Sequence, residues 1–227
     1  MALTWKAILK SSHSLILLSL FHVTVAPRME ELSVQQPNST EGKMVWDFTQ
    51  DPPPDLTKWF EESDVVREPG KSKAVLVQQK SRLFQRAVFF TMLNPQPNGA
   101  GFAGMRTLLS GPDTLNLDGY STLQLRVRGQ GQNSHYKICL HHMGMNYEPN
   151  PTYEQTFKVP LNEFTTVNLP LASFEPYYRG RKMNESEVGP LKKSEITSFG
   201  FQIFGGVYLP EKQQGTSSLE IDWVKAT

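Results

Sequence analysis

The sequence of 227 residues contains a single cysteine, Cys139, so no disulfide can form within the chain. We interpret this cysteine as a small apolar strand residue, because no local signature would activate it as a catalytic thiol. An excess of one charge is also missing, since 23 basic residues are balanced by 22 acidic ones. Nucleic-acid binding needs a basic surface against the phosphate backbone, so DNA and RNA are not expected as partners.

Signatures of catalysis, nucleotide binding and metal binding are missing as well. No G-x-S-x-G elbow or triad pattern is visible, and the "GKS" at 70–72 has Val65 where a phosphate loop needs its first glycine. On an extended chain His135 and His141 lie about 20 Å apart, and His142 points the opposite way, so they cannot share one metal. We therefore expect no enzyme activity, no cofactor and no metal site.

No apolar run is long enough for a comfortable transmembrane helix. Residues 1–28 instead combine Lys6 and Lys10 with a stretch free of Lys, Arg, Asp and Glu from Ser14 to Ala26. A basic segment, a short apolar segment and small residues before a cleavage point after Ala26 are typical of a secretory signal peptide. We expect this leader to direct the chain into the secretory pathway, to the endoplasmic reticulum or out of the cell.

Two other interpretations of the leader stay open. A mitochondrial presequence is compatible with the frequent serines and with the lack of an acidic residue before Glu30, although presequences favour arginine and Arg28 is the first one here. Pro27, directly after the proposed cleavage point, also fits the secretory interpretation poorly. The third interpretation is a leader that is not cleaved or has no targeting role.

Residues 29–43 are polar and show no apolar period, so we expect a flexible tether between the leader and a folded body at 44–227. The tether contains the triplet Asn38-Ser39-Thr40, and a second N-x-S/T triplet lies at Asn184-Glu185-Ser186. Asn38 and Asn184 are N-glycosylation acceptors only if the chain enters the secretory pathway. They therefore report on the compartment rather than on the fold.

The body consists of short alternating or β-branched segments separated by turn residues, with no helical period sustained over three turns. The chain has 38% hydrophobic and 20% charged residues, as expected for one globular domain with an appendage. Many short strands at regular spacing predict an all-β fold, and we expect a jelly-roll β-sandwich. After a proline-rich connection at 51–60, which follows the first strand at 44–48, we expect about nine more strands, at 73–80, 83–93, 101–109, 122–129, 135–142, 152–160, 164–171, 196–204 and 218–226.

Alternation within the strands predicts which side chains face the core. In the last strand, at 218–226, Trp223 falls on the apolar face, and Glu220 and Asp222 fall on the polar face, so we do not interpret the two carboxylates as an acid/base pair. We expect Trp223 and Trp46 to be shielded in the core. The clearest alternation is in the strand at 122–129, with Leu123, Leu125 and Val127 on one face and Gln124, Arg126 and Arg128 on the other.

Segments spread over the body occur in the order of one known family. They read "VWDF", "SDVVREPGKSKAVL", "GFAGMRT", "LDGYSTLQLRVRGQGQNSHYKICL", "YEQTFKVPLNEFTTVNLPLASFEPYYRGR", "ITSFGFQIF" and "SLEIDWVKA". Together they resemble the complex I intermediate-associated protein family from Met44 to Ala226. The resemblance implies a jelly roll similar to galactose-binding and carbohydrate-binding-module domains. It also implies a non-catalytic, chaperone-like role, because members of the family assist the assembly of NADH:ubiquinone oxidoreductase in mitochondria.

Two segments depart from the family pattern. Where the family usually has a double glycine and a serine, this chain reads Glu68-Pro69-Gly70-Lys71-Ser72 and keeps one glycine and the serine. The family's "RGDG" turn reads Arg128-Gly129-Gln130-Gly131, so Gln130 replaces its carboxylate. If that carboxylate has a shared function, this chain lacks it; if it only shapes a turn, Gln130 between two glycines can substitute. A secretory leader would also give this chain a different task on the same scaffold.

The stretch "FEPYYRGRKMNES" at 174–186 holds the candidate binding residues, which are Tyr177, Tyr178, Arg179 and Arg181. We expect them to lie in a loop, after Phe174-Glu175-Pro176 has tucked the chain against the end of the sandwich. Tyrosine and arginine dominate the energetics of protein interfaces, and they also stack on sugars and pair with anions. The alternative is that the tyrosines cover the edge of the core and the arginines pair with nearby acidic residues.

The leading hypothesis is a non-catalytic β-sandwich module that contacts protein clients as an assembly factor or chaperone. The alternative is a lectin-like module of the secretory pathway that binds glycan. The sequence does not identify the client.

Overall fold

The computed structural model describes residues 42–66, 68–97, 101–206 and 210–227. The expected leader at 1–28 lies outside these residues, and so does the expected tether up to residue 41. The first strand, β1 (Lys43–Asp47), begins one residue before the expected Met44. Within the described part of the chain, no helix is long and apolar enough to cross a membrane.

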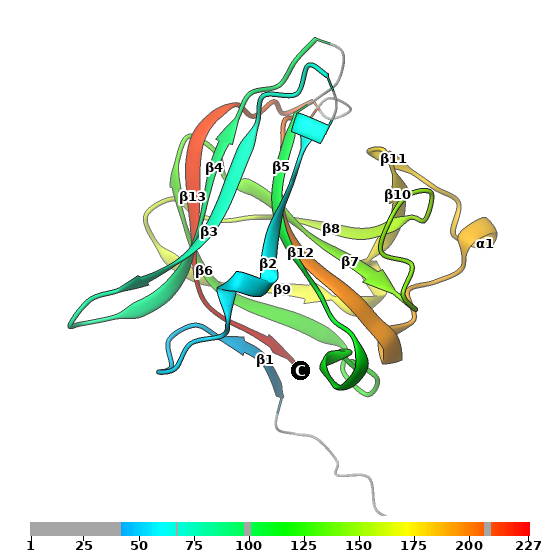
Figure 1. Cartoon of the computed structure of the whole chain (residues 1–227), viewed down its shortest axis with the longest axis horizontal. Coiled ribbons are helices and arrows are strands. Elements are labelled where there is room, and N and C mark those ends of the chain that lie inside the picture. Colours follow the sequence, from blue (N-terminus) through cyan, green and yellow to red (C-terminus); the bar gives the residue numbers. More distant parts are fainter. Residues whose placement is uncertain (1–41, 67, 98–100, 207–209) are drawn as a thin grey trace, which may run out of the picture. The chain divides into compact units, whose positions relative to one another are not determined.

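The strands form two antiparallel sheets of a jelly-roll sandwich (Figure 1), as the sequence predicts. Sheet A has the order β3 (Lys73–Lys80), β4 (Gln85–Leu93), β13 (Gly215–Ala226), β6 (Thr122–Gly131) and β9 (Phe164–Pro170), with β1 also paired to β13. Sheet B has the order β11 (Arg181–Lys182), β10 (Glu175–Tyr178), β8 (Thr152–Lys158), β7 (His135–His142), β12 (Ile196–Phe204), β5 (Phe102–Leu108) and β2 (Trp59–Ser63). The described helical elements are short: α1 (Glu185–Val188), η1 (Leu56–Lys58), η2 (Asp64–Val66), η3 (Gly111–Asp113), η4 (Leu171–Ser173) and η5 (Lys193–Glu195).

The inward side chains of the two sheets form one apolar core. The alternation predicted for β6 is confirmed, because Leu123, Leu125 and Val127 are completely buried. Across the sandwich, Phe199 of β12 lies with its ring centroid 4.6 Å from that of Trp46, which packs against the core and is partly rather than fully buried. Each such buried side chain stabilises the fold by about 1.5–3 kcal/mol relative to exposure.

The prediction of a connection at 51–60 is wrong in its second part. Trp59 and Phe60 begin β2, which pairs with β5 at the edge of sheet B. The ring of Trp59 stacks on that of Phe201, with the centroids 5.6 Å apart, so tertiary packing holds this short segment extended. The three prolines before it concealed the strand, because they read as a turn.

The predicted burial of Trp223 is also wrong. The register of β13 shifts between Ile221 and Trp223, at a β-bulge against β6. One extra residue reverses the faces of the strand beyond it, so Val224 rather than Trp223 enters the core. Trp223 is opposite Arg126, an outward residue, and is only partly buried.

Asp64 and Ser72 are held together by hydrogen bonds. The buried carboxylate of Asp64 accepts hydrogen bonds from the backbone N–H of Ser72 at 2.9 Å and from its hydroxyl at 2.7 Å. A Cβ on Gly70 would lie 1.9 Å from the carbonyl oxygen of Asp64, so only glycine fits there. The glycine and serine that this chain shares with the family pattern therefore have a structural role in this contact with Asp64.

Candidate functional site

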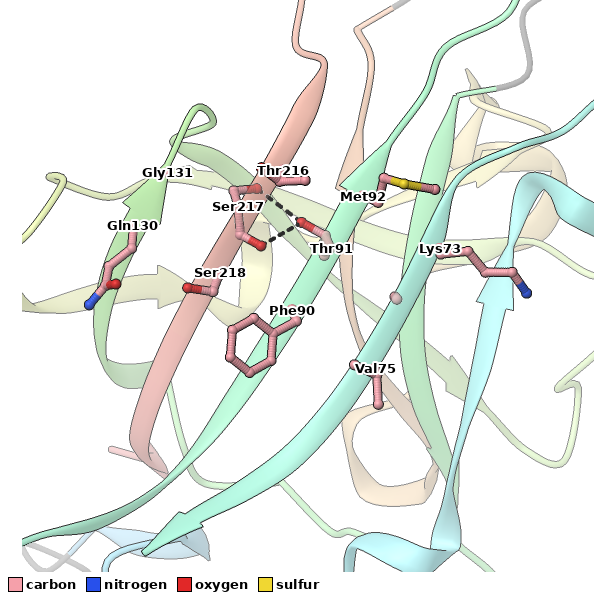
Figure 2. A pocket seen from close by; sticks show the side chains of 11 residues that line it. Lys73, Val75, Phe90, Thr91, Met92, Gln130, Gly131, Thr216, Ser217 and Ser218 are labelled. Atoms are coloured by element: carbon pink, nitrogen blue, oxygen red, sulfur yellow. Dashed lines mark hydrogen bonds between the residues drawn. The ribbon is translucent and has the colours of Figure 1, made fainter. Parts of the chain in front are cut away.

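An open groove of about 600 Å³ lies on the outer face of sheet A, over β3, β4, β13 and the end of β6 (Figure 2). Its apolar side chains are Val75, Phe90 and Met92, with exposed fractions of 46%, 46% and 44%. Outward positions on a sandwich strand are ordinarily polar, so three exposed apolar neighbours mark a surface suited to binding a partner. The rim is formed by Lys73, Gln130, Gly131, Thr216 and Ser218.

Strand pairing brings the apolar residues of the groove together. Val75 in β3 is the cross-strand partner of Phe90 in β4, and Met92 lies on the same face two residues further along β4. Thr91, between them, is buried, and its Oγ1 lies 2.9 Å from Ser217 Oγ of β13 (Figure 2). The floor of the groove is therefore a fixed sheet surface, ready to receive a ligand without rearrangement.

The groove is close to electrically neutral. Lys73 is the one charged side chain among the described residues that line it, and its Nζ lies 3.3 Å from Glu61. The side-chain amide of Gln130 donates to the carboxylate of Glu220. A carboxylate at position 130, as in the family pattern, would lie beside that of Glu220 and be repelled by it. Gln130 avoids this repulsion and adds no charge to the rim.

Beyond the groove, the outer face of sheet A carries a self-contained cluster of charges. Glu220 accepts from Arg86 Nη1 at 2.6 Å and from Arg128 Nη2 at 2.8 Å. The guanidinium groups of Arg86, Arg126 and Arg128 also lie over the ring of Phe164, at 4.5, 5.6 and 4.7 Å from its centroid. Glu220 lies on the outer face as predicted, and its oxygens are engaged in these ion pairs.

The candidate residues at 177–181 lie in a short hairpin, not in a loop. Tyr177 and Tyr178 belong to β10, Arg181 begins β11, and Arg179 sits in the two-residue turn with φ of 50°. Because side chains alternate along a strand, Tyr177 and Tyr178 point to opposite faces. The expectation of a loop is wrong because the turn at Arg179-Gly180 is tight enough to pair its flanking residues.

The four residues do not converge on one site. The guanidinium of Arg179 is bound by the carboxylate of Glu148, with Nε and Nη2 at 3.1 and 2.5 Å from its two oxygens. It also lies 5.3 Å from the ring centroid of Tyr178. Burial, together with Glu175 and Glu154, raises the pKa of Tyr177. Pairing of arginine with a nearby acid, the alternative weighed from the sequence, is found for Arg179.

Tyr177 borders a second polar surface, the outer face of sheet B. Lys137 of β7 forms an ion pair with Glu154 of β8, with Nζ and Oε2 2.5 Å apart and both side chains largely buried. The guanidinium of Arg106 lies between the rings of Phe60 and Tyr147, at 4.9 and 5.1 Å from their centroids. This face therefore combines aromatic rings with buried charged groups.

Asn184 is exposed, and its Oδ1 accepts from the backbone N–H of Ser186 at 3.2 Å, which caps α1. Asn38 lies outside the described residues. Cys139 is buried on the outer face of sheet B, and burial raises the pKa of its thiol well above the ordinary value. No group of three or more His, Cys, Asp and Glu side chains that could hold a metal occurs in the described part of the chain.

Sequence reasoning missed the groove, although β4 carries a signal for it. In "AVFFTML" the inward residues Ala87 and Phe89 alternate with Val88, Phe90 and Met92, which are apolar and point outward. A strand with one solvent-facing side should alternate with polar residues. Apolar residues on both faces of a strand therefore indicate a second buried contact, which the chain itself does not supply at Phe90 and Met92.

Comparison with known proteins identifies one family. The family described as complex I intermediate-associated protein 30 matches residues 46–221. Among curated proteins, none matches the sequence.

Solved structures with a similar fold include carbohydrate-binding modules. The family 11 module of the cellulosomal cellulase Lic26A-Cel5E of Clostridium thermocellum is 13% identical, with a TM-score of 0.57 over 82% of this chain and 93% of that one. The family 11 module from Clostridium thermocellum in complex with a β-1,3-1,4-mixed-linked tetrasaccharide is 14% identical, with a TM-score of 0.56 over 82% of this chain and 94% of that one. At this identity the likeness concerns the fold alone.

Proposed function

Because this chain belongs to the complex I intermediate-associated protein 30 family, we propose that it is a non-catalytic binding module that acts as an assembly factor. It holds an apolar segment of a protein client in the groove over Val75, Phe90 and Met92. The observation that carries this function is the exposure of these three side chains next to charges that are already paired. Covering them removes apolar surface from water, at about 25 cal/mol per Å².

The composition of the groove favours an uncharged apolar client segment. Phe90 offers a flat ring, and the flexible thioether of Met92 adapts to side chains of different shape. Hydroxyl and amide groups of Thr216, Ser218 and Gln130 at the rim are placed to hydrogen-bond the polar backbone of the client. An adaptable apolar floor with a polar rim suits a protein that holds clients during assembly.

Photo-crosslinking from the groove tests this function. A photoreactive phenylalanine analogue at Phe90 should form adducts with client proteins in cells, and a second substitution, Met92→Ser, should weaken them. The matched control carries the analogue at Tyr147, an aromatic residue of sheet B that is 59% exposed. If adducts form equally from the analogue at Tyr147, or if they persist in Met92→Ser, the client binds to another surface.

We propose the secretory pathway as the compartment, with the mitochondrion as the alternative. The support comes from the leader pattern at 1–28 and from the exposure of Asn184 in the second N-x-S/T triplet. In the secretory pathway the client would be a luminal or secreted protein. A mitochondrial address would instead favour a respiratory-complex client, as in the family's name.

Glycan binding on the outer face of sheet B is the second candidate function. The observation that favours it is the set of aromatic rings, Phe60, Tyr147 and Tyr177, beside the polar groups of Glu62 and Glu154. Sugars bind by stacking on such rings while their hydroxyls meet carboxylates and amides. Calorimetric titration with a glycan panel tests this candidate. If this face binds glycan, we expect a heat of binding for the wild type. Tyr177→Ala and Tyr147→Ala should abolish this heat, and Tyr178→Ala should retain it.

A further inference from the structure

The tip of the β3–β4 hairpin carries the most exposed large apolar side chain in the described part of the chain. Leu83 is 94% exposed, and its neighbour Phe84 is 39% exposed. Figure 1 shows this tip projecting from the body of the sandwich, at the left of the view. The groove at Val75 and Phe90 lies at the other end of the same hairpin. The tip is therefore a separate surface, and its function is independent of the proposed client site.

Hydrogen bonds within the tip fix its shape and occupy its backbone donors. The N–H of Ser81 donates to the carbonyl oxygen of Phe84 at 2.8 Å. The hydroxyl oxygen of Ser81 accepts from the N–H groups of Leu83 and Phe84, both at 3.1 Å. Three backbone donors of the tip thus have partners without water, which lowers the cost of moving the tip into an apolar medium.

The segment of sequence that contains the tip has charge of one sign. No Asp or Glu occurs between Glu68 and Asp113, a stretch that contains six Lys and Arg residues in a chain of net charge +1. Arg82 lies next to Leu83. The guanidinium of Arg86 lies 4.4 Å from the ring centroid of Phe84, but its charge is already paired with Glu220. Lys80 is paired with Asp51, but both side chains are more than half exposed, so this pair is weak and can exchange partners.

We propose that this tip docks the protein on the surface of an anionic phospholipid bilayer. Leu83 enters the boundary between headgroups and acyl chains, Phe84 lies at the level of the headgroups, and Arg82 and Lys80 contact lipid phosphates. An apolar projection with a basic border matches this medium, because burial of the side chain and attraction to anionic lipid act together. The groove at the other end of the hairpin stays open to a client while the tip is docked.

Vesicle flotation with the full chain tests the docking. The protein should float with vesicles of phosphatidylcholine and phosphatidylserine and much less with vesicles of phosphatidylcholine alone, and salt should weaken the binding. Leu83→Ser should lower the binding constant by about tenfold or more, the effect of losing one buried leucine side chain. Val66→Ser, at an apolar residue that is 76% exposed elsewhere, is the matched control and should bind as the wild type does.

A fluorescent label reports on insertion directly. Leu83→Cys can be labelled selectively with an environment-sensitive dye, because Cys139 is buried. Its emission should shift to the blue on anionic vesicles and stay unchanged on neutral ones. Binding that Leu83→Ser leaves intact, or a label that stays in water, would overturn the proposal. The proposal would also be overturned if the protein bound no vesicles and Leu83→Ser removed the client adducts that form from Phe90. That result would show that the tip contacts a protein.

Discussion

The outer face of sheet B and the β3–β4 hairpin of sheet A use their side chains in opposite ways. On sheet B, charged groups pair with each other: the buried Lys137 with the buried Glu154, and the buried Arg106 with the partly exposed Glu62 at 3.2 Å. On sheet A, the hairpin β3–β4 leaves apolar side chains in water, both in the groove and at the tip. In the first arrangement the charged groups have partners within the fold, whereas the second leaves apolar surface of the kind that a binding partner can cover.

This contrast shows why the jelly roll by itself does not specify a function. Both faces are built on the same antiparallel ladders, and both contain aromatic residues, such as Phe164 on sheet A and Phe60 on sheet B. The difference lies in whether the polar or apolar groups that point outward already have partners in the chain. This difference supports the proposal that a client binds to sheet A, and we expect substitutions on the two faces to separate stability from binding.

The largest expected effect comes from breaking a buried pair on sheet B. Lys137→Met should lower the free energy of unfolding by about 3–5 kcal/mol, because it leaves the carboxylate of Glu154 buried without its cation. Urea unfolding measures this loss. The double variant Lys137→Met/Glu154→Leu should recover most of it, since it removes both charges.

Lys73→Met on sheet A is the matched control for that pair. Lys73 is 59% exposed and Glu61 28% exposed, so their ion pair is screened by water. Lys73→Met should therefore lower the free energy of unfolding by no more than about 0.5 kcal/mol. If Lys73→Met and Lys137→Met lowered the free energy of unfolding equally, the ion pairs on the two sheets would not differ in burial as described here.

A smaller effect is expected from pH. Burial, followed by the positive charges of Arg106 and His142, lowers the pKa of His141 from 6.5 to about 4. The unfolded chain therefore binds a proton between these values that the folded chain does not bind. Stability is full above pH 6.5 and falls as the pH drops toward 4, by up to about 3 kcal/mol from this residue.

Urea unfolding at pH 7 and pH 5 measures the slope, and His141→Gln should flatten it. The pKa of His142 is also lowered by burial, so this residue adds to the slope in the wild type, while burial of Glu62 raises its pKa and acts in the opposite sense. The comparison of variant with wild type isolates His141. A slope that His141→Gln leaves unchanged would show that another group dominates.

Much of the fold was predictable because period-two patterns are local. The strands β3, β7 and β12 lie where the alternation or apolar density places them. The bulge in β13 was not predictable, since a single extra residue beyond Ile221 has no signature in the sequence but reverses the face of Trp223. The strand β2 was hidden in the same way, because its extended form depends on pairing with β5.

The candidate site was predicted less well than the fold. Tyr177 and Arg179 are close in sequence, but alternation and a tight turn send the side chains of that segment in different directions. Groove residues come instead from strands far apart in the sequence, and only their register shows that Val75, Phe90 and Ser218 are neighbours. A list of suitable residue types within one segment does not contain that information.

A third prediction separates binding from stability within one strand. Phe90→Ala should lower the free energy of unfolding by less than about 1 kcal/mol, because nearly half of its side chain is in water. Phe89→Ala, one residue earlier and completely buried, should cost about 3–5 kcal/mol. Thermal or urea unfolding of both variants checks this. A large loss in Phe90→Ala would mean that Phe90 supports the fold, and the groove would lose its main anchor for a client.

The smallest effect on stability is expected at Asn184, where the compartment is tested. If the chain enters the endoplasmic reticulum, Asn184 and Asn38 should carry glycans, and removal of N-glycans should increase the mobility of the protein on a gel. Asn184→Gln should abolish part of that shift and cost no more than about 1 kcal/mol, because it removes only the cap of a helix of four residues. Asn184 follows β11 at the edge of sheet B, so its glycan should leave client adducts from Phe90 on sheet A unchanged. A protein without glycosidase-sensitive mobility that fractionates with mitochondria would overturn the secretory proposal, and it would direct the search for the client to the respiratory complexes.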